Sequence, residues 1–154
     1  MKTIIVYESK HHGNTYKLVE AIANKNEVDT VNVRNAEIVN LAQYDRIGFA
    51  SGIAYSKPYK NLMTYAQDNL PANKEVFFVY TCGKQHSKYE LPMKELAESR
   101  NCKFLPPVTA TTILFFSKDK HKSYTSKYIV THPGSDYQKK NEHSTDLLYQ
   151  VLIY

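Results

Sequence analysis

The first 23 residues place a strand, a short polar loop and a helix in immediate succession. The β-branched, apolar run at residues 3–7 lacks polar alternation, which is typical of a strand covered on both faces. After the loop, apolar residues recur at the spacing of one helix face, namely Leu18, Val19, Ile22 and Ala23. The loop therefore lies where a central strand passes into a helix. The first turn of that helix has backbone N–H groups without internal partners, and it attracts anions.

The loop carries side chains suited to an anion, and we predict that it binds phosphate through Ser9, Lys10, His11, His12, Gly13, Asn14 and Thr15. Gly13 permits close approach of the backbone or a positive φ, and Asn14 tolerates a left-handed conformation. The hydroxyls of Ser9 and Thr15 suit phosphate oxygens. From spacing alone, a plain strand-to-helix turn with capping hydroxyls explains the loop about equally well.

The rest of the chain alternates further strands with helices. Apolar runs predict strands at residues 28–33, 46–51, 75–80 and 102–105. Helical patterns follow Pro58, up to residue 70, and span residues 90–100. This alternation predicts an α/β fold in one domain over residues 1–154, a doubly wound parallel sheet of five strands in the order 2-1-3-4-5 with helices on both faces. The loops after strands one, three and four then meet at one edge.

The first two of these loops resemble those of a known family. The pattern Ser9-x-x-His12-Gly13-Asn14-Thr15 after an amino-terminal strand resembles the phosphate-binding loop of the flavodoxin family, although a serine or threonine commonly stands where His12 is. Residues 50–62 resemble a flavodoxin-like subgroup that includes menaquinone-dependent protoporphyrinogen oxidase. The resemblance covers residues 1–105 and implies a flavodoxin-like fold with FMN as the cofactor.

The second and third loops are expected to hold the flavin ring. The predicted binding residues there are Ser51, Gly52, Ile53, Ala54, Tyr55 and Lys57 in the second loop, and Thr81, Cys82, Gly83 and Lys84 in the third. A flavin needs a flat aromatic or apolar wall and backbone donors along its edge, which Tyr55 and the glycines can supply. The alternatives are that Tyr55 is a half-buried loop tyrosine, and that Cys82 is a small buried apolar residue.

Composition narrows the class of partner. The formal charge is +5, unlike that of many flavodoxins, but the late lysines are interrupted by Asp119 and lack a binding motif, so we expect a solvated surface and no nucleic-acid partner. No apolar stretch reaches membrane-spanning length and no signal peptide is evident, which predicts a cytoplasmic protein. Neither the two cysteines nor the histidines have the spacing of a metal site.

Beyond residue 105 the family ending is not matched. Residues 109–116 are compatible with a β segment, residues 118–138 are predicted to be a polar loop, and Ser144 is a candidate cap for a final helix.

The leading functional hypothesis is an FMN-binding electron carrier that exchanges electrons with a redox partner protein or a small-molecule acceptor. It predicts no catalytic residue, because the ring carries the electrons. The rivals are an FMN-dependent oxidoreductase, of the protoporphyrinogen oxidase or quinone reductase type, and a cofactor-free interaction domain of the same fold.

Overall fold

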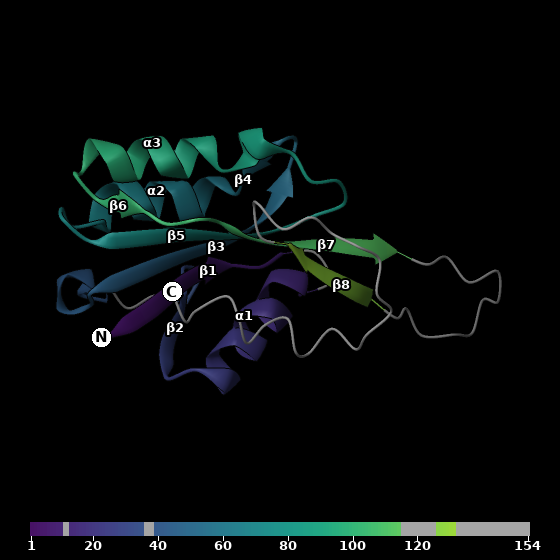
Figure 1. Ribbon diagram of the computed structural model, residues 1–154, viewed down its shortest axis with the longest axis horizontal. Helices are drawn as coiled ribbons and strands as arrows, with labels where there is room; N and C mark the ends of the chain where they lie inside the picture. The colour runs from purple at the N-terminus through teal and green to yellow at the C-terminus, as the bar shows by residue number, and fades with distance from the viewer. Residues whose placement is uncertain (11–12, 36–38, 115–125, 132–154) are drawn as a thin grey trace.

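The computed structural model describes residues 1–10, 13–35, 39–114 and 126–131, and these form one sheet with helices on both faces (Figure 1). The strands are β1 (Thr3–Glu8), β2 (Val28–Asn32), β3 (Arg46–Ala54), β4 (Lys57–Pro58), β5 (Glu75–Cys82), β6 (Lys103–Phe104), β7 (Val108–Leu114) and β8 (Ser126–Thr131). The sheet has the order β2-β1-β3-β5-β7-β8, while β4 pairs with β3 and β6 with β5. The predicted parallel order is confirmed across its first four positions.

The fifth position differs in detail from the prediction. The strand expected at residues 102–105 is limited to β6, and β7 continues along the same side of β5. Phe104 pairs with Val76 and Val108 with Val79, so residues 105–107 stand opposite only two residues of β5. Pro106 and Pro107 lie at this interruption, where their missing N–H groups cannot join the ladder.

The carboxyl-terminal part of the sheet corrects a second expectation. β7 bears out the candidate β segment after residue 108, but β8 lies within residues 118–138, so the prediction of a continuous polar loop there is wrong. β8 pairs with β7 in the antiparallel direction and adds a sixth position to the order. The predicted final helix after Ser144 falls outside the described residues.

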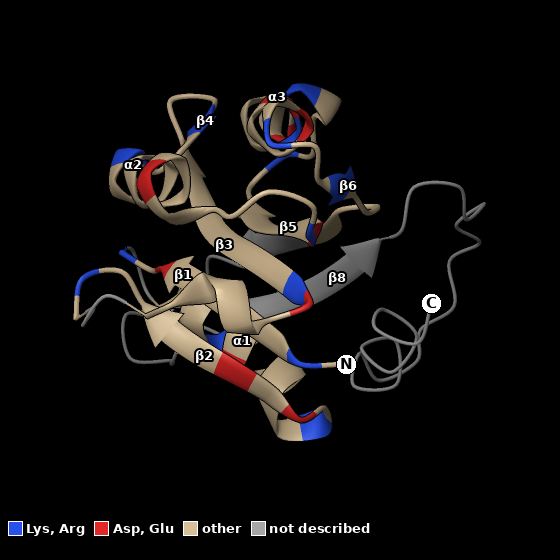
Figure 2. Ribbon diagram, turned by 90° about the vertical axis from the view of Figure 1, so that its left-hand side faces the viewer, with Lys and Arg blue, Asp and Glu red and all other residues tan. Residues whose placement is uncertain are grey.

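The helices divide between the two faces of the sheet (Figure 2). They are α1 (Asn14–Lys25), α2 (Lys60–Asn69) and α3 (Leu91–Ser99), with single 3-10 turns at Leu41–Gln43 and Ser87–Tyr89. α1 packs its Leu18, Val19 and Ile22 against one face, and α2 and α3 cover the other. Alternate residues of β5 enter the two cores, with Phe77 on the α1 side and Phe78 on the α2 and α3 side.

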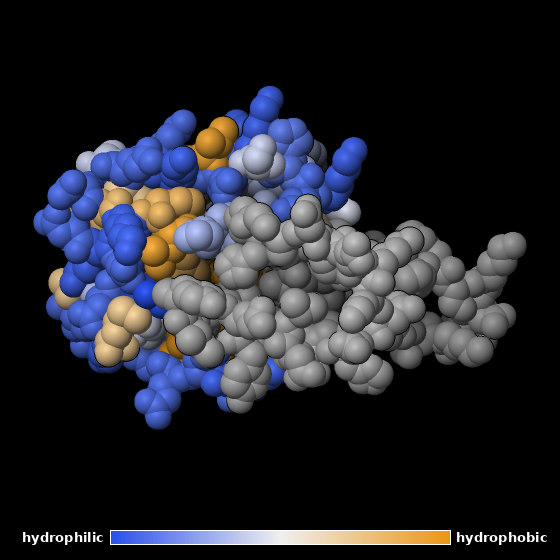
Figure 3. Space-filling view, viewed as in Figure 1, coloured by the Kyte–Doolittle hydropathy of each residue, from blue (hydrophilic) through white to orange (hydrophobic). Residues whose placement is uncertain are grey.

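The surface follows from this layering. In the space-filling view, hydrophilic residues lie along the visible outline of the described part. Apolar residues are seen in its middle, at the position of the sheet in the ribbon diagram (Figure 3). None of the helices within the described ranges is both long and apolar enough to cross a membrane.

The start of α2 was predicted incorrectly. Pro58 was expected to open the helix, but it belongs to β4, where it pairs with Ile53, and the helix begins at Lys60. The chain between β3 and α2 is therefore a small hairpin rather than an open loop.

Candidate functional site

The ends of three parallel strands bring the predicted loops to one edge of the sheet. In register, Glu8 of β1 pairs with Ser51 of β3, and Gly52 of β3 pairs with Thr81 of β5. The loops that follow β1, β3 and β5 are therefore neighbours, as the strand order predicted.

The first loop is tied to the start of α1. Gly13 precedes the helix with a φ of 68°, in the left-handed region that glycine adopts without steric cost, and it has no side chain with which to cap the helix itself. Tyr16 donates its backbone N–H to the Ser9 hydroxyl at 3.2 Å, and Lys17 donates to the Gly13 carbonyl at 2.9 Å. His11 and His12 lie outside the described residues.

A buried contact between hydroxyls joins the first loop to the third. The Oγ1 atoms of Thr15 and Thr81 lie 3.0 Å apart, and both residues are buried. Because a hydroxyl both donates and accepts, each retains capacity for a further hydrogen bond. This contact links the start of α1 to the end of β5, next to the predicted phosphate site.

The second loop is a two-residue hairpin turn between β3 and β4. Tyr55 and Ser56 have φ values of 51° and 63°, the combination that a type I′ turn requires. The Tyr55 side chain is fully exposed, so the alternative of a half-buried tyrosine is wrong.

The base of that hairpin is ordered by Ser51, which is buried. Its hydroxyl donates to the Gly52 carbonyl at 2.7 Å and accepts from the Tyr59 backbone N–H at 2.9 Å. The Tyr59 ring lies close over Gly52, because a Cβ atom at residue 52 would lie 2.7 Å from the Tyr59 hydroxyl. Ile53 and Ala54 are partly exposed at the end of β3, and Lys57 is exposed in β4.

The third loop begins inside β5. Thr81 and Cys82 are buried strand residues, and Cys82 packs in the core on the α2 and α3 side, which favours its interpretation as a small buried residue. Gly83 and Lys84 follow and are exposed. Below this loop, burial raises the pKa of Tyr80 to about 12, and burial also raises the pKa of Glu90.

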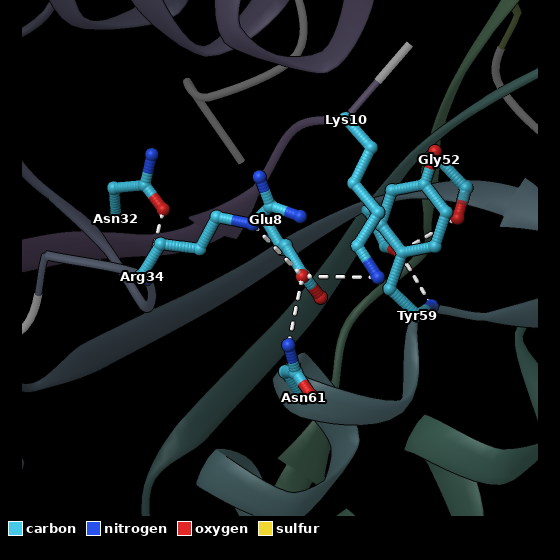
Figure 4. Close-up of polar contacts among 8 residues, drawn as sticks. Glu8, Lys10, Asn32, Arg34, Gly52, Tyr59 and Asn61 are labelled. Carbon is cyan, nitrogen blue, oxygen red and sulfur yellow. Dashed lines mark hydrogen bonds and ion pairs between the residues drawn. The ribbon is translucent and has the colours of Figure 1, made fainter.

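Sequence reasoning missed a charged cluster at the end of β1. Glu8 is fully buried, and its Oε1 lies 3.2 Å from Lys10 Nζ, 3.4 Å from Arg34 Nε and 3.2 Å from Asn61 Nδ2 (Figure 4). The period of two along β1 was the available signal, because it places Glu8 on the same face as the core residues Ile4 and Val6.

Two further observations concern metal-binding side chains and a hollow elsewhere on the molecule. Within the described ranges, no three His, Cys, Asp or Glu side chains gather closely enough to hold a metal ion. A hollow of about 510 Å³ lies at the opposite edge of the sheet, beside Lys2, Lys25 and Val28, away from the three loops.

The parallel sheet, the helices on both faces and the three loops at one edge define an α/β protein with the flavodoxin arrangement. A family model described as a flavodoxin domain matches residues 4–107, so the chain belongs to the flavodoxin family. The resemblance of residues 50–62 to the oxidase subgroup stays a prediction.

The chain is also similar to one protein in sequence and to two solved structures in fold. The chain is 35% identical over 83 residues to an uncharacterised protein of Methanocaldococcus jannaschii, a match that covers 54% of this chain and 55% of the relative, so the chain spans about half the length of that relative. Its fold is similar to that of an FMN-bound Fusobacterium nucleatum flavodoxin, with a TM-score of 0.55 and 14% identity over 68% of this chain and 70% of the other. It is also similar to a Lactobacillus acidophilus flavoprotein in complex with FMN, with a TM-score of 0.54 and 19% identity over 70% and 91% of the two chains.

Proposed function

We propose that the protein binds FMN at the carboxyl edge of the sheet and acts as an electron carrier. The observation that carries this proposal is the start of α1, where Gly13 has a positive φ and Thr15 contacts Thr81 of β5. A Cβ atom at Gly13 would have no described atom within 4 Å, and this open space supports phosphate binding by the first-turn amides.

The residues present fit the cofactor. The Ser9 and Thr15 hydroxyls and the first-turn amides of α1 would hold the phosphate, with His11 and His12 as further predicted donors. The hairpin with Tyr55 at its tip, and the third loop with Gly83, would flank the ring. Gly83 also has no described atom within 4 Å of where a Cβ would lie, so its backbone is open to a ligand.

The carrier role is supported by the chemistry that a bound flavin supplies by itself. Flavin, when bound, supplies one- and two-electron chemistry, and the chain needs only to bind it, orient it and set the charge around it. The likeness of residues 50–62 to an oxidase subgroup supports the second candidate, an FMN-dependent oxidoreductase.

Flavin titration tests the binding. We expect the protein to quench FMN fluorescence on addition and to bind riboflavin far more weakly, because riboflavin lacks the phosphate that the helix end would hold. Equal affinities would contradict the phosphate site, and absence of quenching would overturn the proposed function.

Turnover separates the two candidate functions. A carrier with FMN bound shows little steady-state reduction of a quinone by a nicotinamide nucleotide unless a reductase is added, whereas an oxidoreductase shows it alone. A porphyrinogen substrate in the same assay tests the oxidase type.

A further inference from the structure

We propose that Glu8 is a specificity-determining positioning residue that holds the Lys10 ammonium at the second loop, so that this charge does not contact the phosphate of the bound nucleotide. The inference rests on the proposed FMN binding. It assigns a role to a residue that no sequence motif contains, and it alters the predicted role of Lys10 as a phosphate ligand.

The first step of the argument is the environment of Glu8. The carboxylate is fully buried, and Oε1 meets three donors from three separate segments: Lys10, Arg34 and Asn61 (Figure 4). The second oxygen, Oε2, has no hydrogen-bond partner within the described part of the chain. Burying a carboxylate costs free energy unless donors and positive charges compensate it. The two nearby cations supply this compensation, and the interior screens their attraction to Glu8 only weakly.

The second step is the position of Lys10. Its Nζ lies 3.2 Å from Glu8 Oε1 and 4.5 Å from the centroid of the Tyr59 ring. Tyr59 in turn lies over Gly52 at the base of the hairpin. The lysine therefore extends from the first loop to the second, between a carboxylate and the face of an aromatic ring.

The third step compares the two anions available to Lys10. The Glu8 carboxylate lies in the interior, where charges are screened weakly. Ser9, Gly13 and Asn14 at the start of α1 are partly exposed, so water and salt would screen a phosphate held there. Arg34 approaches the same oxygen, but at 3.4 Å and with half of its side chain exposed, so it does not replace the closer lysine. We therefore infer that Lys10 stays with Glu8 when FMN binds, and that hydroxyls and backbone amides recognise the phosphate.

The test is the ratio of the riboflavin Kd to the FMN Kd, which isolates the contribution of the phosphate. We measure it for the native protein, Glu8→Gln, Lys10→Met and the double variant. Lys10→Met is expected to leave the ratio within about twofold of the native value. Glu8→Gln releases Lys10 toward the phosphate, and one new charge-assisted hydrogen bond is expected to raise the ratio about tenfold. The double variant is expected to return to the native ratio.

Lys2 offers a matched control at the opposite edge of the sheet. Its Nζ lies 3.9 Å from Asp29 and 4.6 Å from the centroid of the Tyr44 ring, the same kinds of partner that Lys10 has. Lys2→Met is expected to leave both flavin affinities unchanged.

The outcomes distinguish this inference from the proposed function. A native protein that binds no FMN overturns both. A native protein that binds FMN, with a ratio that falls in Lys10→Met or stays unchanged in Glu8→Gln, overturns only the role of Glu8. If circular dichroism shows Glu8→Gln to be unfolded, Lys10→Met alone decides, because the inference requires its ratio to equal that of the native protein.

Discussion

The hydroxyls of Thr15 and Thr81 meet in the buried layer between α1 and β5, 3.0 Å apart although 66 residues separate them in sequence. This contact fixes the start of the helix against the end of the strand. It couples the geometry of the predicted phosphate loop to that of the third loop.

Replacing either threonine with valine tests this coupling. Thr15→Val or Thr81→Val keeps the shape but leaves the other hydroxyl without this partner, so each is expected to lower the free energy of unfolding by about 1–2 kcal/mol. The double variant should lose clearly less free energy of unfolding than the sum of the two single losses, because no buried hydroxyl is then left without its partner. Urea unfolding of the four proteins gives the coupling energy, and additive costs would show that the two hydroxyls do not interact.

Gly48→Ala tests the packing of the sheet against α1. Gly48 pairs with Phe77, and a Cβ at Gly48 would overlap the Phe77 ring. We expect a loss of about 1–3 kcal/mol in the free energy of unfolding, measured by denaturant titration.

Two variants control that prediction. Gly83→Ala adds the same methyl group where no described atom lies within 4 Å, and it should cost less than about 0.5 kcal/mol. Adding Phe77→Leu to Gly48→Ala should recover part of the loss. A Gly48→Ala protein as stable as the native one would mean that the ring moves aside freely.

Glu75 makes stability depend on pH in the acid range. Hydrogen bonds from Arg46 and then from Lys103 hold the pKa of Glu75 below its ordinary value of 4.5. The folded state therefore favours the ionised form. The resulting stabilisation is fully present above the unfolded-state pKa and is lost as the pH falls through the folded-state pKa.

We expect Glu75→Gln to lower the free energy of unfolding by on the order of 1 kcal/mol at pH 7. The difference from the native protein should shrink as the pH is lowered toward about 3, because the native carboxyl takes up a proton when the pH falls through its folded-state pKa. Urea unfolding at the two pH values checks this, and a difference that is the same at both would contradict the assigned ion pair.

Tyr55→Asn separates ring binding from folding. Asparagine tolerates the positive φ of 51° at this position, and the tyrosine side chain is fully exposed, so the free energy of unfolding should change by less than about 0.5 kcal/mol. Loss of an aromatic contact should weaken FMN and riboflavin equally, by about threefold to tenfold. Fluorescence titration with both flavins measures this.

Ser56→Asn is the control within the same turn, because Ser56 also has a positive φ but no ring. It should alter neither flavin affinity. A Tyr55→Asn protein with native affinity for both flavins would remove Tyr55 from the ring site.

The sequence was informative wherever burial dictated residue type. Apolar runs without alternation identified β1 and β5, and the helical spacing of Leu18 and Ile22 identified the face of α1. β8 was missed because its pairing with β7 comes from tertiary context, while the surrounding composition is polar.

The errors near the site have specific physical causes. Pro58 suits the first turn of a helix, but a turn with positive φ at Tyr55 and Ser56, which such residues rarely adopt, returns it to β3 instead. Glu8 escaped notice because a single carboxylate after an apolar strand has no motif, and its three donors come from segments that only folding brings together.

The end of the β7–β8 pair also affects how a large molecule can reach the third loop. The pairing of β7 with β5 ends at Thr111, opposite Cys82, so residues 112–114 of β7 and residues 126–128 of β8 continue as a two-stranded ribbon past the paired part of β5 (Figure 1). That projection lies on the β7 side of the end of β5, where the third loop begins. For the proposed carrier, we therefore expect a large partner to reach the three loops from the flank where β1 and β2 end.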